Sequence, residues 1–277
     1  MRRPAISENY FYKKGAVGCL LLHGFTGSPN ELLELADFLA GHNVTVSLPT
    51  LPGHGTHAAD LFNYRWQDWF DCVKTEHRRL AKVCDEVFVC GLSMGGTLAL
   101  HLAAHRPVQG VIALAAAVQF PPWQKYGVRL AKNIIKFRRK KSGEDVHDGV
   151  AKAKLGSYRR YPYYAVDQFF QLVEHVRAEL PEIEQPLLIV HSPGDHTVDF
   201  ENAQIIFDSV ASTHKRKVEL QDSFHVITVD VEKELVQQEV IAFLRAHSAL
   251  LKKPAVKRAK PKRKPTSKTS KKSAGRS

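Results

Sequence analysis

Short apolar runs alternate with amphipathic segments along most of this chain of 277 residues. The apolar runs lie at 15–22, 44–48, 87–90, 108–117 and 186–191. Continuous apolar runs of this kind are typical of strands buried on both faces of a parallel sheet. Segments between them, such as 30–40 and 97–104, place apolar residues at helical spacing. The alternation predicts an α/β fold built on a mostly parallel, doubly wound sheet.

The alternation is interrupted between residues 119 and 185. This segment is aromatic and basic, and it contains helical patterns such as 128–137. A connection of this length is far longer than an ordinary loop and usually marks a lid or a binding element. We therefore predict a core made of 1–118 and 186–251, with 119–185 inserted as a small helical cap. The basic run at 136–141 is interpreted as solvated cap surface rather than as an anion site.

The formal net charge of +12 comes from one end of the chain. Residues 252–277 contain 12 Lys and Arg and no Asp or Glu, so the preceding 251 residues hold 28 basic and 28 acidic side chains. The tail has no aromatic residue, and this composition predicts a disordered, Lys/Arg-rich C-terminal segment. Such a tail can contact nucleic acid or anionic membrane non-specifically, or it can act as a solubilising segment without a partner.

Membrane, disulfide and metal signals are weak in this sequence. No apolar run approaches the ~18 residues of a membrane span, and the first residues lack the apolar stretch of a signal peptide. We therefore expect a cytoplasmic protein without a transmembrane segment. The four cysteines form no C-x-x-C pair, which favours free thiols. No cofactor or metal is expected, since His54-x-x-His57, and His191 with Asp195 and His196, are interpreted as loop and supporting residues.

The apolar run at 87–90 ends in a glycine-flanked serine, Gly91-Leu-Ser93-Met-Gly95, and a helical pattern follows it directly. Strand, sharp turn and helix form the context in which G-x-S-x-G is a nucleophile elbow. Glycines on either side of the serine let the strand and the helix approach without a clashing Cβ. Ser93 is therefore the candidate nucleophile, at a helix N-terminus that favours developing negative charge.

A serine nucleophile needs a base to take its proton and an acid to orient that base. Asp195 follows the strand at 186–191, and His225 follows the next predicted strand, near 217–221. Serine, acid and histidine then occur in the order of the hydrolase fold, at the same carboxyl edge of the sheet. The rivals fit less well, because His191 lies inside a strand and Asp199 precedes a helix, where a carboxylate is more often an N-cap.

Five motifs, in this order along the chain, resemble those of the α/β-hydrolase superfamily. They are His-Gly-Phe-Thr-Gly at 23–27, Pro-Gly-His-Gly at 52–55, Gly-Leu-Ser-Met-Gly-Gly at 91–96, Gly-Asp-His-Thr-Val at 194–198 and Ser-Phe-His-Val-Ile-Thr at 223–228. The resemblance is greatest to bacterial carboxylesterases and monoacylglycerol lipases. It implies an α/β-hydrolase fold, a Ser93–Asp195–His225 triad, an oxyanion hole from the backbone N–H groups of Phe25 and Met94, and a helical cap over an acyl pocket.

The resemblance implies a serine hydrolase that cleaves small-molecule esters through an acyl-enzyme. The expected substrates are short- to medium-chain acyl esters or monoacylglycerols. A thioesterase or another acyl hydrolase that uses the same triad is an alternative. A second alternative is a non-catalytic binding protein that its basic tail, 252–277, tethers to nucleic acid or anionic lipid.

Overall fold

The computed structural model describes residues 9–140, 143–155 and 157–251. These residues form a seven-stranded sheet in the order β1-β3-β2-β4-β5-β8-β9. Its strands are β1 (Tyr10–Tyr12), β2 (Val17–Leu22), β3 (Thr45–Leu48), β4 (Glu86–Leu92), β5 (Gly110–Leu114), β8 (Leu187–His191) and β9 (Lys215–Glu219). The strands pair in parallel except β1, which pairs antiparallel with β3. The predicted mostly parallel, doubly wound sheet is confirmed, and β1 is an addition to the predicted strands.

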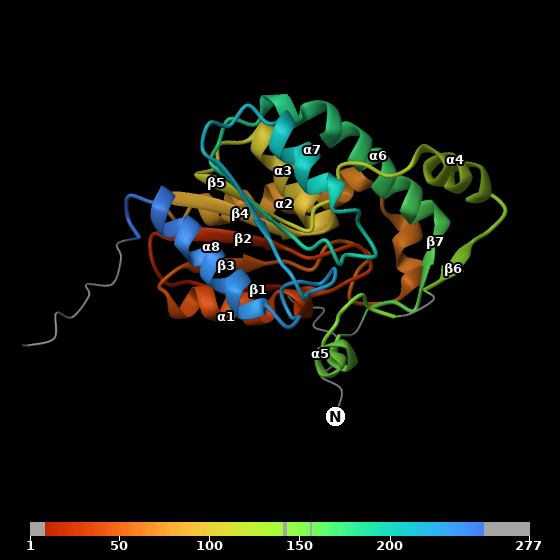
Figure 1. Ribbon diagram of the computed structural model, residues 1–277, viewed down its shortest axis with the longest axis horizontal. Helices are drawn as coiled ribbons and strands as arrows, with labels where there is room; N and C mark the ends of the chain where they lie inside the picture. Colours follow the sequence, from red (N-terminus) through yellow and green to blue (C-terminus); the bar gives the residue numbers. More distant parts are fainter. Residues whose placement is uncertain (1–8, 141–142, 156, 252–277) are drawn as a thin grey trace, which may run out of the picture.

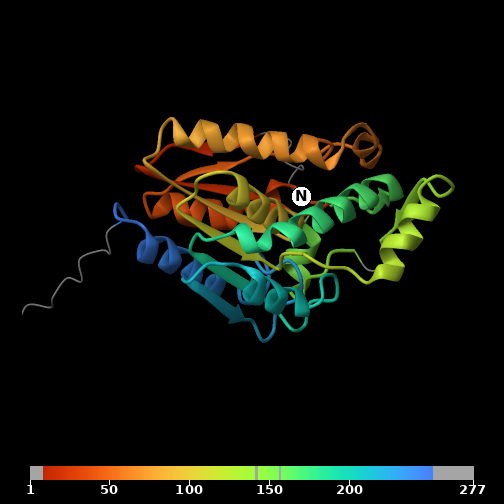
Figure 2. The same cartoon turned by 90° about the horizontal axis from the view of Figure 1, so that it is seen from above.

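Helices cover both faces of the sheet, as Figures 1 and 2 show. The helices of the core are α1 (Leu33–Gly41), α2 (Trp66–Ala81), α3 (Met94–His105), α7 (Glu201–Ser209) and α8 (Lys233–His247), with 3₁₀ turns η1 (Pro29–Glu31) and η2 (Ala58–Asn63) in the loops. Alternate strand residues enter two separate apolar clusters: Leu20 and Val89 face α2 and α3, whereas Leu21 and Phe88 face α1 and α8. This two-sided burial explains why the central strands are apolar throughout.

The chain between β5 and β8 adds a further group of helices and short strands to the fold (Figure 2). They are α4 (Pro122–Ala131), β6 (Phe137–Arg139), α5 (Gly149–Lys154), β7 (Arg160–Pro162), α6 (Tyr163–Glu179) and η3 (Leu180–Glu182). Helix α6 packs against both α3 and α4. We call this segment, residues 119–185, the cap, and its role as a lid stays a prediction.

The helical pattern at 128–137 does not continue as one helix. Helix α4 ends at Ala131, and Phe137 begins a strand that pairs antiparallel with 160–162. Strand pairing with a distant segment therefore outweighs the local helical periodicity. The cap therefore contains a two-stranded sheet in addition to its predicted helices.

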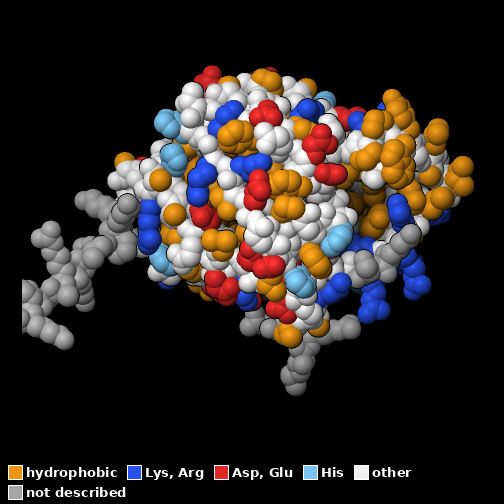
Figure 3. Space-filling view, in the orientation of Figure 1, with side chains coloured by type: hydrophobic (Ala, Val, Ile, Leu, Met, Phe, Trp, Pro, Cys, Tyr) orange, Lys and Arg blue, Asp and Glu red, His pale blue; other side chains and the backbone are white. Residues whose placement is uncertain are grey.

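The outer face of α4 and the turn after it carries exposed apolar side chains beside lysines and arginines (Figure 3). The apolar residues are Trp123, Tyr126, Leu130, Ile134 and Ile135. Within the part of the chain that the structure describes, no helix combines the length and the hydropathy needed to cross a membrane. All four cysteines are free, as predicted. The predicted basic tail, 252–277, lies outside the described residues.

Candidate active site

Ser93 lies at the sharp turn between β4 and α3. Its backbone has φ 55° and ψ −119°, a conformation that is unfavourable for a residue with a Cβ. A Cβ on Gly91 would collide with the carbonyl oxygen of Gly95, and a Cβ on Gly95 would collide with that of Leu22. The two glycines of the motif are therefore required by contacts between backbones, and the turn places Ser93 immediately before the first residue of α3.

His225 and Asp195 lie against each other beyond the ends of two neighbouring parallel strands, β8 and β9. The Nδ1 atom of His225 is 2.7 Å from Oδ2 of Asp195. The other carboxylate oxygen, Oδ1, accepts the backbone N–H groups of Thr197 and Val198, each at 2.8 Å. Each oxygen therefore has its own partners, and the carboxylate is held in a fixed orientation towards the imidazole.

Asp195 and His225 each stabilise the charged form of the other. Burial by itself raises the pKa of Asp195, but the neighbouring His225 and hydrogen bonds from His191 and His225 hold it well below its usual range. Burial by itself lowers the pKa of His225, but the Asp195 carboxylate raises it overall. Asp195 is thus ionised at neutral pH, and His225 is a stronger base than a free imidazole.

His191 is a second imidazole on the same carboxylate, which fits the supporting role that was predicted for it beside Asp195. Its Nε2 atom lies 3.0 Å from Oδ2 of Asp195 and 3.1 Å from the carbonyl oxygen of Val198. His191 is the last residue of β8 and is fully buried. Its position at the carboxyl end of a strand is the sequence signal that pointed to this contact. Asp199 instead accepts the N–H of Glu201 at the start of α7, as a helix-capping carboxylate does.

Asp145 of the cap connects the two loops that carry Asp195 and His225. Its carbonyl oxygen accepts the backbone N–H of His225 at 3.0 Å. Its carboxylate accepts the N–H and Nδ1 of His196, each at 2.9 Å, and the hydroxyl of Thr197 at 3.1 Å. Asp145 is thus a positioning residue for both loops, and no local sequence pattern identifies it.

Ser93 and His225 line the same cavity of about 650 Å³, a volume in the range of small-molecule sites. One part of the wall is aromatic and is formed mainly by the cap: Phe25, Phe120, Trp123, Tyr161, Phe169 and Phe170. Another part is charged: Glu31, Arg138, Arg139, Lys140, Glu144 and Asp145. Three residues of the basic run at 136–141 therefore line the cavity, while Lys136, Arg138 and Arg139 are solvent-exposed, as predicted for that run.

The loop after β2 passes directly over Ser93. A Cβ added to Gly24 would lie 3.4 Å from Cβ of Ser93, so the neighbouring Phe25 is close to the serine as well. Phe25 packs its ring against Phe169, with centroids 5.6 Å apart. Met94 is the first residue of α3, where backbone N–H groups have no partner inside the helix. Phe25 and Met94 therefore both belong to segments that adjoin Ser93, and their role as oxyanion donors stays a prediction.

Glu31 lies beneath this loop, and the sequence argument did not identify it. Its Oε2 atom accepts the N–H of Gly24 at 2.8 Å, and the residue is 6% exposed. Burial, with a smaller contribution from Glu144, raises the pKa of Glu31 to about 7. Glu31 therefore changes charge near neutral pH, next to the loop that carries the predicted oxyanion donor Phe25.

We expect Glu31→Gln to stabilise the protein at high pH only. The folded state holds a proton on Glu31 between its usual pKa of 4.5 and about 7, so the wild type loses stability as pH rises through this range. The amide of Gln keeps an acceptor for Gly24. In urea unfolding, the free energy of unfolding of the variant should exceed that of the wild type by on the order of 3 kcal/mol at pH 8. The two values should match near pH 4.5.

The exposed Glu184→Gln is the matched control, and its effect on unfolding should not depend on pH. A Glu31→Gln effect that is equal at both pH values would show that the ionisation of Glu31 does not act on stability.

Two comparisons of sequence connect this geometry to known proteins. A family model described as serine aminopeptidase, S33 (Hydrolase_4) matches residues 14–232. A thermostable monoacylglycerol lipase of Bacillus sp. (strain H-257) is 36% identical over 251 residues, which are 88% of this chain and 98% of the lipase. A carboxylesterase of Bacillus subtilis (strain 168) is 29% identical over 239 residues, 85% of this chain and 95% of the esterase.

Solved structures show the same similarity. A structure described with LipS and LipT, two metagenome-derived lipolytic enzymes, superposes with a TM-score of 0.82 at 31% identity, and covers 87% of this chain and 98% of its own. The monoacylglycerol lipase of Paleococcus ferrophilus superposes with a TM-score of 0.74 at 19% identity, over 87% of this chain and 100% of the lipase. The second likeness concerns the fold alone.

Proposed function

Because the chain belongs to the family described as serine aminopeptidase, S33, has the α/β-hydrolase fold and is an esterase- or monoacylglycerol lipase-type enzyme, we propose that it hydrolyses carboxylic esters through an acyl-enzyme. Ser93, His225 and Asp195 are the catalytic triad in this proposal. The observation that carries the proposal is the 2.7 Å contact of His225 with Asp195 beside the cavity that Ser93 lines.

In the proposed reaction, Nε2 of His225 accepts the proton of the Ser93 hydroxyl while Oγ attacks the ester carbonyl carbon. The backbone N–H groups of Phe25 and Met94 stabilise the oxyanion of the tetrahedral intermediate. The intermediate collapses, the C–O bond to the alcohol breaks, and the imidazolium gives its proton to the leaving alcohol. Water, deprotonated by His225, then releases the acid from Ser93 in a second addition and collapse. Asp195 keeps the proton of His225 on Nδ1 throughout.

The cavity has an aromatic wall and a charged wall, and this lining favours as substrate an ester with an apolar acyl chain and a polar alcohol. The aromatic cap side chains can surround an acyl chain, and charged residues such as Glu31 and Lys140 can hydrogen-bond hydroxyl groups. We propose short- to medium-chain acyl esters or monoacylglycerols as substrates. The cap, 119–185, then acts as the lid that supplies the acyl side of the site.

We expect kcat/KM on nitrophenyl esters to rise from acetate to a medium chain and to fall towards palmitate. Each buried CH₂ contributes about 0.8 kcal/mol until the cavity is filled. The same assay should include three other substrates: a monoacylglycerol, an acyl thioester and an aminoacyl nitroanilide. A higher kcat/KM on the thioester or the anilide than on every ester would replace the ester proposal with thioesterase or peptidase activity.

Contact of the tail, 252–277, with nucleic acid or anionic lipid stays a prediction, as does action in the cytoplasm, which the free thiols favour. We expect a truncated chain, 1–251, to keep the esterase activity of the full chain and to lose its salt-sensitive retention on duplex DNA or on vesicles containing phosphatidylserine. Equal retention of both chains at low salt would contradict a binding role for the tail.

A further inference from the structure

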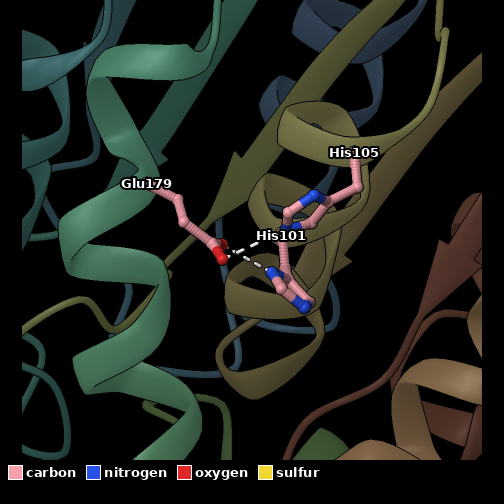
Figure 4. Close-up of side chains that lie close together, drawn as sticks. All are labelled: His101, His105 and Glu179. Atoms are coloured by element: carbon pink, nitrogen blue, oxygen red, sulfur yellow. Dashed lines mark hydrogen bonds and ion pairs between the residues drawn. The ribbon is translucent and has the colours of Figure 1, made fainter.

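A second cluster of chemically active side chains lies away from the cavity, between α3 and α6. Figure 4 shows His101 and His105 on one face of α3 and Glu179, the last residue of α6, pointing at both imidazoles. The Nδ1 atom of His101 is 2.6 Å from Oε2 of Glu179, and Nε2 of His105 is 3.0 Å from Oε1. The proposed function uses none of these three residues.

The three side chains match the ligand chemistry of zinc. Two histidines four residues apart lie on the same face of a helix, and a carboxylate from another element completes the set. One ligand atom from each residue lies within 4.8 Å of the others. Zinc bonds of 2.0–2.2 Å place tetrahedral ligand atoms about 3.3–3.6 Å apart, so small side-chain shifts bring all three atoms to one ion. Among the described residues, these three form the group of His, Cys, Asp and Glu side chains whose ligand atoms lie close enough together to hold one metal ion.

We infer that His101, His105 and Glu179 form a binding site for a divalent transition metal, with Zn²⁺ as the ion that fits the ligand set best. The ion takes the place of the protons that now bridge each imidazole to the carboxylate. Without an ion the same residues form a closed hydrogen-bonded cluster, so binding of zinc has to compete with these two hydrogen bonds. That competition sets the affinity and can be measured.

The surroundings combine packed aromatic rings with an open hollow. Phe70 and Trp66 of α2 pack on the His101 ring, with centroids 4.1 and 5.6 Å away, and hold that imidazole in place. The same two rings, together with His101 and His105, line a hollow of about 370 Å³, where water can supply the fourth ligand. Lys74, Arg106 and Asp71 also line this hollow; the Lys74 ammonium is paired with Asp71 at 2.6 Å, which reduces its repulsion of a cation.

The position of the site indicates a structural role. His101 follows Ser93 by eight residues, which corresponds to about 12 Å along the axis of α3. An ion here is therefore too far away to polarise a substrate in the cavity. It links the helix that begins at the elbow to α6, the cap helix that carries Phe169 and Phe170 on the cavity wall. Metal binding then fixes the end of the cap helix on the core.

The test is calorimetric titration of ZnCl₂ into the full chain after removal of metal with EDTA and desalting. We expect the wild type to bind one Zn²⁺ per chain. His105→Gln and Glu179→Gln should each lower the affinity for Zn²⁺ more than about tenfold. His214→Gln, which removes an exposed histidine before β9, is the matched control and should bind like the wild type. At zinc concentrations near 100 times Kd, the wild-type Tm should rise by about 5 to 10 °C.

Wild-type affinity in both variants, or no saturable binding by the wild type, would overturn the proposal. Circular dichroism without metal shows whether each variant is folded. If both variants unfold, Co²⁺ added to the wild type decides the question. Intense visible bands of a four-coordinate ion support the site, and a spectrum like that of aqueous Co²⁺ contradicts it. Esterase activity is not the readout, so failure of the triad proposal would not affect the outcome.

Discussion

Ser93→Ala should lower kcat on the best nitrophenyl ester by at least about 10⁴-fold, because no other group then forms the acyl-enzyme. Residual turnover above the rate in water would come from the oxyanion hole and from substrate binding. KM should change little, since Oγ makes its decisive interaction in the transition state. Mass spectrometry of the wild type during turnover should find an acyl group on the peptide that contains Ser93, and the variant should lack it.

A matched control for this experiment is Ser47→Ala. Ser47 is also a buried serine, within strand β3, but its hydroxyl donates to Glu76 and it does not line the cavity. Loss of that hydrogen bond to a carboxylate should cost about 2 kcal/mol of stability and leave kcat nearly unchanged. Turnover by Ser93→Ala within tenfold of the wild type would remove Ser93 from the nucleophile role.

The elbow is predictable from sequence because its requirements are local. A buried strand, a strained residue and a helix follow one another within about a dozen residues, and each has a residue composition that can be recognised in the sequence. The structure adds the reason for the two flanking glycines, since carbonyl oxygens of Gly95 and Leu22 occupy the places of their missing Cβ atoms. The G-x-S-x-G motif is a weak signal by itself, but it predicts the turn when an apolar strand precedes it and a helical pattern follows it.

The contact of Asp195 with His225 is predictable from topology rather than from spacing. The two residues are thirty positions apart, but each follows a strand, and β8 and β9 are parallel neighbours. Parallel neighbours end at the same edge of the sheet. The observed 2.7 Å contact confirms that placement, whereas the catalytic roles stay predictions until the variants are assayed.

Glu31 and Asp145 could not be identified from the sequence because their partners are set by tertiary packing. The turn η1 folds Glu31 back under Gly24, and its sequence context is that of an ordinary acidic residue in a first helical turn. Asp145 meets His225 across eighty residues and from another part of the fold. The three-residue strands β1, β6 and β7 were missed for a similar reason, since they exist through pairing and have no periodic pattern of their own.

Asp195→Asn should lower kcat by about 10³- to 10⁴-fold with the fold intact, because it reverses the tautomer of His225. Oδ1 of Asp195 accepts two backbone N–H groups, so the amide oxygen of Asn must occupy that position. The NH₂ group then takes the place of Oδ2 and donates to Nδ1 of His225. The imidazole proton moves to Nε2, which can no longer accept the proton of Ser93.

The pH profile separates this cause from a general loss of structure. The Asp195 carboxylate raises the pKa of His225, so its removal lowers that pKa. Activity requires neutral His225; the acid limb of kcat/KM should therefore move to lower pH in Asp195→Asn, although the plateau is much lower. Asp199→Asn is the matched control, because the Asp199 carboxylate lies four residues along the chain and, among the hydrogen bonds of the described residues, accepts only the N–H of Glu201. The pH profile and plateau of this variant should stay those of the wild type. An Asp195→Asn enzyme with an unmoved acid limb would show that the carboxylate does not act through His225.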